Sequence, residues 1–282
     1  MLRRIDKLWC LAQVLSLDVV LAALSLLFFV SRLLQQPLQP LYYLSLALAV
    51  WIIYIGDHFL DALHFSGQIA VPRYHFFQQH RILWFGLLMF VASALVSLVT
   101  CYLPSRLLIA GMGMAAIAAT HLFIAFRWRR WPWLKELAVA LIFSTGIILG
   151  PWSKFEFGFH RPILAIWLHI FLASWSNLIS FAIFERSLDR RQSAWSQVLW
   201  LGLPINRCLV MILSTTNTVL CIALVFILEI QPLSTLVFLP VTFGGALLPA
   251  AMLLNYVFWK RQQRYRRFAD LVFLLYILAA LF

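Results

Sequence analysis

Acidic residues are scarce in this chain of 282 residues, which contains ten Asp and Glu against 22 Lys and Arg. Charged residues of both signs make up only 11% of the chain, whereas 63% is hydrophobic and the mean hydropathy is +0.91. A water-facing surface cannot hide so much apolar sequence, so the composition excludes a soluble globular domain. The four cysteines have no C-x-x-C spacing, which argues against a zinc site or a disulfide framework.

The long apolar stretches predict an all-α polytopic membrane protein that forms one transmembrane domain over residues 1–282. We expect nine transmembrane helices around a central cavity, arranged as two four-helix halves plus a ninth helix. The expected spans are 8–34, 41–64, 82–103, 106–126, 133–152, 162–184, 206–230, 234–259 and 266–282. The first apolar run passes Phe29 without a signal-peptide cleavage site, so we expect it to stay in the protein as the first span.

The net charge of +12 is distributed by topology and forms no single basic patch, so nucleic acid is not an expected partner. Most Lys and Arg fall in alternate loops, and the other loops hold only Arg32, Arg106, Lys154 and Arg161. The positive-inside rule then predicts a cytoplasmic N-terminus and a C-terminus on the far side. A bacterial inner (plasma) membrane is the expected location, with membrane lipid as a partner.

Four of the ten acids form two pairs with i,i+4 spacing, Asp57/Asp61 and Glu185/Asp189, at the ends of predicted spans two and six. This spacing places both carboxylates on one helix face, where like charges repel by about 0.2 to 0.5 kcal/mol. Helix C-termini also disfavour carboxylates. Mg²⁺ resolves both problems, because it binds one or two carboxylates together with substrate phosphates and water. We therefore expect these four acids to be metal ligands and catalytic residues that clamp a diphosphate.

The alternative for each pair is neutralisation by nearby bases. Arg186, Arg190 and Arg191 stand beside Glu185 and Asp189, so ion pairing is a real alternative there. The nearest arginine to Asp57 and Asp61 is Arg73, and ionisable groups within spans usually have a function. The sequence separation between Asp57 and Glu185 equals that between Asp61 and Asp189, which suggests an internal repeat of four helices.

Several cations near the acids are candidates to bind phosphate. Arg73 and Arg81 flank an aromatic and imidazole-containing segment after the first pair, and guanidinium groups bind phosphate oxygens bidentately. Lys135 begins predicted span five, where the helix dipole also favours anions. An ordinary basic loop with interfacial aromatic residues is the alternative for each arginine. Glu136 is expected to be a first-turn helix acid.

Polar residues also occur within the predicted spans. Asn177 continues the i,i+4 row of Glu185 and Asp189, and we expect it either to bind substrate or to form a helix–helix hydrogen bond. Asp18 should face the interior of the bundle, because an unpaired charge in lipid costs about 2.5 to 3.5 kcal/mol. A structural role is expected for His121, His169, Arg207 and Asp270.

The segment Gly56-Asp57-His58-Phe59-Leu60-Asp61 and the run from Asn177 to Asp189 resemble the UbiA superfamily of intramembrane prenyltransferases. The resemblance implies that Mg²⁺ at two acid-rich motifs binds an isoprenyl diphosphate, and that the prenyl group passes to a hydrophobic, typically aromatic acceptor. Asp57 and Asp61 match the first motif, and Glu185 and Asp189 match the second with a glutamate in place of one aspartate. Tyr54 stands where the first motif usually has asparagine, which places it among the substrate-binding residues.

The function expected from this resemblance is Mg²⁺-dependent prenyl transfer in quinone or lipid biosynthesis. Two alternatives stay open on the same fold. One is a non-enzymatic transporter or lipid-binding protein, in which Asp18, His121 and His169 matter more than the loops. The other is a prenyl-diphosphate cyclase, which needs no acceptor.

Overall fold

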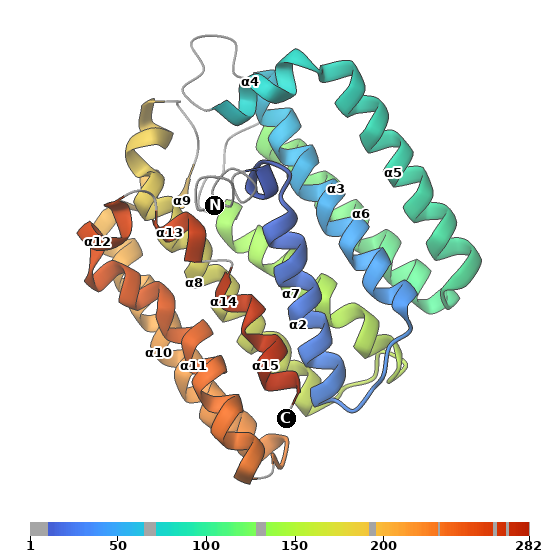
Figure 1. The fold of residues 1–282 in the computed structure, drawn as a ribbon, viewed down its shortest axis with the longest axis vertical. Coiled ribbons are helices and arrows are strands. Elements are labelled where there is room, and N and C mark those ends of the chain that lie inside the picture. The colour runs from blue at the N-terminus through green and yellow to red at the C-terminus, as the bar shows by residue number, and fades with distance from the viewer. Residues whose placement is uncertain are drawn as a thin grey trace, which may run out of the picture. The chain divides into compact units, whose positions relative to one another are not determined.

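The computed structural model describes residues 11–64, 72–127, 134–191, 196–230, 232–261, 264–268 and 271–281. Within these ranges the chain is helical and contains no strand (Figure 1). The helices are α2 Leu17–Leu33, α3 Pro40–His64, α4 Pro72–Gln79, α5 Arg81–Tyr102, α6 Ser105–Arg127, α7 Lys135–Ser153, α8 Arg161–Arg191, α9 Gln197–Leu201, α10 Leu203–Ile227, α11 Pro232–Leu254, α12 Tyr256–Lys260, α13 Arg264–Phe268, α14 Leu271–Leu274 and α15 Tyr276–Ala280. The all-α class predicted from the sequence is therefore confirmed for the described residues.

Seven of the described helices are long and apolar enough to cross a membrane. They cover Pro40–Leu63, Arg81–Tyr102, Ser105–Ile124, Lys135–Ser153, Arg161–Arg191, Leu203–Ile227 and Leu236–Leu254. Large apolar side chains such as Ile82, Phe90 and Phe226 are more than 70% exposed on these helices. Exposed apolar surface on this scale fits lipid and not water, which supports the integral-membrane prediction.

The first and last predicted spans are not among these seven. Span 8–34 contains α2, whose 17 residues extend about 26 Å, less than the hydrocarbon core of about 30 Å. Span 266–282 contains α14, α15 and part of α13, and none of these three helices has more than five residues. The count of nine spans stays a prediction.

The chain divides into two compact units. The first contains α3 to α6 and the start of α2, through Leu24. Within it, α3 packs against α4, α5 and α6. The packed face of α3 includes Ile55, Phe59 and Ala62, which are all buried at the spacing that one helix face requires.

The second unit contains the remainder of α2, from Ser25, and α7 to α15. Its centre is α8, which packs against α7, α10 and α11. In the most apolar window of α8, 67% of the residues are buried, against 6% in α5, so α8 is a core helix and most of the surface of α5 is exposed. The 31 residues of α8 extend about 46 Å, so the helix reaches beyond a hydrocarbon core of about 30 Å.

Candidate functional site

The first acid pair lies near the C-terminal end of α3. Asp57 and Asp61 are half-buried and stand one helical turn apart. Tyr54 is also half-buried and shares their face, because positions 54, 57 and 61 follow the i,i+3,i+7 spacing. This face lies roughly opposite the packed face that Ile55 belongs to. The structure therefore groups three of the predicted site residues on one side of α3.

The short helix α4 packs against the end of α3 beside this pair. Phe77 is completely buried, and its ring lies 4.8 Å from Trp84 and 6.5 Å from His58 between centroids. Gln78 Nε2 donates a 2.6 Å hydrogen bond to the carbonyl oxygen of Ala62 on α3. The segment flanked by Arg73 and Arg81 is thus, in its described part, a helix anchored to α3.

The two arginines of this segment have different positions. Arg81 is the first residue of α5 and is exposed. Arg73 belongs to α4, but its side chain lies outside the part of the structure that is described. The helix N-terminus at Arg81 adds positive potential to that of the guanidinium group, which suits an anion.

The second acid pair lies in the last turns of α8 and has a cationic partner far away in the sequence. Arg266 Nε on α13 donates a 2.7 Å hydrogen bond to Oε1 of Glu185. Both side chains are about one-quarter exposed, at 27% for Arg266 and 24% for Glu185. A charge-assisted bond of this length is among the stronger hydrogen bonds in proteins. The cation that neutralises Glu185 is therefore not one of the arginines beside it.

The tyrosine that precedes Arg266 also faces Glu185. The hydroxyl of Tyr265 donates toward Oε1 of Glu185 at 3.4 Å. Burial, and secondly the negative charge of Glu185, raises the pKa of Tyr265 to about 12. The phenol therefore keeps its proton at neutral pH and remains a donor.

Lys135 and Asp189 come together in this unit, although 54 positions separate them in the sequence. Asp189 interacts electrostatically with Glu185, Lys135 and Arg266. Lys135 is the first residue of α7, as predicted. Two acids and two bases from α7, α8 and α13 therefore form one cluster. We call Lys135, Glu185, Asp189 and Arg266 the charge cluster.

Glu136, next to Lys135, has a structural role that its local sequence does not indicate. It is 6% exposed, and both of its carboxylate oxygens accept the backbone N–H of Gln197, at 3.1 and 3.2 Å. Gln197 is the first residue of α9. A carboxylate at a helix start satisfies an N–H that has no partner within that helix. Glu136 therefore ties α7 to the start of α9.

Asn177 is 5% exposed on α8, and its Oδ1 has no hydrogen-bond partner among the described residues. A helix–helix hydrogen bond to this oxygen, one of the two predicted roles, is thus not present in this part of the chain. A buried amide oxygen without a donor usually has a water or ligand partner.

His169 lies in a buried hydrogen-bond network that links three helices of the second unit. Its Nδ1 is 2.8 Å from Oδ1 of Asn217 on α10, and its Nε2 is 2.8 Å from the hydroxyl of Tyr276 on α15. The hydroxyl of Tyr276 fits only because Gly245 on α11 has no side chain, since a Cβ there would overlap it. These contacts agree with the structural role expected for His169.

Asp18 is buried in the first turn of α2. Its Oδ1 accepts the backbone N–H of Val19 at 3.0 Å. A helix N-terminus favours a carboxylate, so this position gives Asp18 part of its stabilisation.

The two acid pairs fit Mg²⁺ unequally. Asp57 and Asp61 offer two carboxylates one turn apart, which suits an ion whose remaining ligands are substrate phosphates and water. Glu185 has its Oε1 engaged by Arg266, so a metal there competes with an existing ion pair. Among the described residues, no group of three or more His, Cys, Asp and Glu side chains is placed to hold a metal ion. These residues therefore do not form a complete metal site by themselves, and Mg²⁺ binding would also need phosphate oxygens as ligands.

Comparison with known proteins finds no matching family model, no matching curated protein and no matching solved structure.

Proposed function

We propose that the protein is an integral-membrane prenyltransferase, which uses Mg²⁺ to transfer an isoprenyl group from an isoprenyl diphosphate to a hydrophobic acceptor. The observation that carries the proposal is the pair Asp57 and Asp61, two half-buried carboxylates one turn apart at the end of an apolar helix. Ionisable residues in such helices are costly and usually functional. An aromatic acceptor from quinone or lipid biosynthesis is the proposed partner.

In this proposal the chain's own residues bind and orient the diphosphate. Asp57 and Asp61 hold the metal, and Tyr54 on the same face contacts the substrate. Arg81 and Arg73 bind phosphate oxygens through their guanidinium groups. Mg²⁺, when bound, supplies positive charge that stabilises the departing diphosphate.

The reaction breaks the allylic C–O bond, and the diphosphate leaves with the electron pair. A carbon of the acceptor forms the new bond to the prenyl group and loses a proton. The apolar helices keep the prenyl chain in the bilayer. The prenylated product therefore stays in the membrane, and the diphosphate is the product released to water.

The charge cluster is a second proposed phosphate-binding site. Glu185 and Asp189 act as the second acid pair, and Lys135 binds a phosphate oxygen at the start of α7. A metal at Glu185 would use Oε2 or compete with Arg266 for Oε1, and the guanidinium group of Arg266 would be close enough to assist in phosphate binding. Asn177, whose buried Oδ1 has no donor in the described part of the chain, orients a metal-bound water or the substrate.

The number of spans, their arrangement and the sides of the two termini are part of the same proposal. Nine spans in two four-helix halves plus a ninth helix would place the N-terminus in the cytoplasm and the C-terminus on the far side. The basic loops support this orientation. The proposed location is a bacterial inner membrane.

A direct assay tests this function. Purified protein is incubated with Mg²⁺ and allylic diphosphates, with and without aromatic acceptors, and released pyrophosphate is measured. Release that needs both Mg²⁺ and an acceptor is the expected result. Release without an acceptor would identify a cyclase. No release with any allylic diphosphate would count against both enzymes.

The second candidate function is a non-enzymatic transporter or lipid-binding protein. The bond from Arg266 to Glu185 favours it, because this pair neutralises the second motif without a metal. A functional scan separates the two candidates. Asp57→Asn should abolish function in a prenyltransferase, whereas Asp18→Asn should be the damaging change in a transporter.

A further inference from the structure

The last turns of α8 carry acids and bases on different faces. Glu185 directly precedes Arg186, and Asp189 directly precedes Arg190; one residue step rotates a helix by about 100°. The acids belong to the charge cluster with Arg266. The arginines instead line a pocket that includes neither acid. The positive charge of this second face is therefore not used to neutralise the acid pair.

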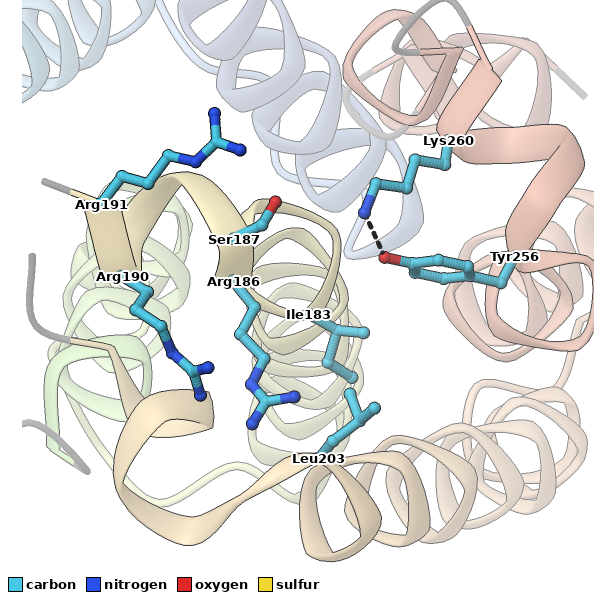
Figure 2. Close-up of a pocket in the computed structure, with 8 residues that line it drawn as sticks. All are labelled: Ile183, Arg186, Ser187, Arg190, Arg191, Leu203, Tyr256 and Lys260. Atoms are coloured by element: carbon cyan, nitrogen blue, oxygen red, sulfur yellow. Dashed lines mark hydrogen bonds between the residues drawn. The ribbon is translucent and has the colours of Figure 1, made fainter. Parts of the chain in front are cut away.

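This pocket lies between α8, α10 and α12 and has a volume of about 350 Å³ (Figure 2). We call it the basic pocket, after the four cationic side chains that line it, Arg186, Arg190, Arg191 and Lys260. No Asp or Glu is among its lining residues. The volume falls at the small end of the range of ligand sites, about 300 to 1,000 Å³.

The cations of the basic pocket lack anionic partners in the described part of the chain. Nε of Arg186 is shielded from solvent and has no hydrogen-bond partner there. Nζ of Lys260 donates to the neutral hydroxyl of Tyr256 at 2.8 Å and lies 5.1 Å from the centroid of the same ring. The dipoles of α8 and α12 favour bases in their last turns, but a helix dipole provides only a partial negative charge and no anionic partner. The arrangement is suited to an anion.

The geometry favours a phosphate group. Figure 2 shows Arg186 and Arg190 extending in the same direction from α8, whereas Arg191 extends to the other side. Two guanidinium groups on the same side of α8, one turn apart, can each donate to phosphate oxygens. Leu203, at the start of α10, also lines the pocket, so the positive end of a 25-residue helix adds to the attraction.

We expect the pocket to lie at the level of the lipid headgroups. Three helix ends meet there, because α8 ends at Arg191, α10 begins at Leu203 and α12 follows the end of α11. Ile183 and Leu203 give the pocket an apolar wall. We propose that the basic pocket binds the phosphate headgroup of an anionic membrane lipid, and that Arg186, Arg190 and Lys260 supply its positive contacts.

Native mass spectrometry of the full-length protein in detergent tests this site. The probes are short-chain phosphatidylglycerol, short-chain phosphatidylcholine and inorganic phosphate. We expect one phosphatidylglycerol to bind, with an affinity that falls at higher ionic strength. Each of Lys260→Gln and Arg186→Gln should weaken that binding about tenfold, by loss of a charge-assisted contact. Arg161→Gln removes the same charge from the exposed opposite end of α8 and should leave binding unchanged.

Lys260 is exposed, so its substitution carries little risk to folding. Arg186→Lys keeps the charge and should retain more binding than Arg186→Gln, which separates loss of charge from misfolding. Equal binding of phosphatidylcholine would overturn the proposal, as would equal binding by the Lys260→Gln and Arg161→Gln variants. If inorganic phosphate binds and phosphatidylglycerol does not, the pocket is a site for a soluble anion and the lipid proposal is overturned.

Discussion

Gly245→Ala gives the sharpest test of the packing in the second unit. A Cβ at position 245 would overlap the hydroxyl oxygen of Tyr276 and lie 3.0 Å from its Cζ. Tyr276 is completely buried, and its hydroxyl is bound to Nε2 of His169 at 2.8 Å. The tyrosine therefore cannot move without giving up this hydrogen bond.

The magnitude follows from two costs. Overpacking of a tight core costs about 1 to 3 kcal/mol. Leaving the buried nitrogen of His169 without its partner adds about 1 to 3 kcal/mol. Partial relaxation makes the sum an upper bound, so we expect a loss of about 2 to 4 kcal/mol and a fall in Tm of about 5 to 10 °C.

The neighbouring glycine provides a matched control. A Cβ at Gly244 would meet only Cγ2 of Val272, at an ordinary contact distance of 3.9 Å. Both substitutions gain the same helix propensity, so their difference isolates the contact with Tyr276. Tm is measured by differential scanning fluorimetry in one detergent. Gly245→Ala protein as stable as Gly244→Ala protein would refute this packing. Combining Gly245→Ala with Tyr276→Phe should cost less than the sum of the single changes, since the overlapping oxygen is then absent.

Three further substitutions test the local sites. Arg266→Ala should destabilise the protein by about 1 to 3 kcal/mol, because it leaves the carboxylate of Glu185 unpaired. Adding Glu185→Gln removes that carboxylate and should recover part of the loss. Additive changes in Tm would contradict an interaction between the two residues. Phe77→Ala should cost about 3 to 5 kcal/mol and release α4 from α3, seen as faster tryptic cleavage in the 72–81 region; unchanged cleavage would contradict this packing. Glu136→Gln removes one of the two oxygens that accept the N–H of Gln197 and should speed hydrogen exchange at that amide. Unchanged exchange would show that the carboxylate does not hold α9.

Hydropathy predicted the helix bounds well for long helices that are apolar throughout. The stretch 82–103 is α5, Arg81–Tyr102, and the stretch 41–64 is α3, Pro40–His64. Hydropathy predicts one span for the stretch 266–282, but its described part consists mainly of short helices. An apolar segment packed on other helices has the same composition as one that crosses the bilayer, so hydropathy does not distinguish the two. Asn255 likewise separates α11 from α12 within the stretch 234–259.

The spacing of the acids correctly placed Asp57 and Asp61 on one face of α3, since such spacing depends on local geometry alone. It could not identify the partner of Glu185, because Arg266 approaches through tertiary structure from 81 positions away. The nearest arginines in the sequence were the natural expectation, and they face the basic pocket instead. The bond from Gln197 to Glu136 is hidden in the same way by its long sequence separation.

Equilibrium binding of geranyl diphosphate with Mg²⁺ or EDTA tests the central claim most directly. Asp57→Ala and Asp61→Ala should each abolish the Mg²⁺-dependent binding and leave expression intact. Glu229→Gln, which removes an exposed carboxylate at a helix end, is the control and should bind as the unaltered protein does. The predicted result is loss of binding in the two aspartate variants and unaltered binding in Glu229→Gln. Unchanged Mg²⁺-dependent binding in either variant would contradict the prenyltransferase assignment.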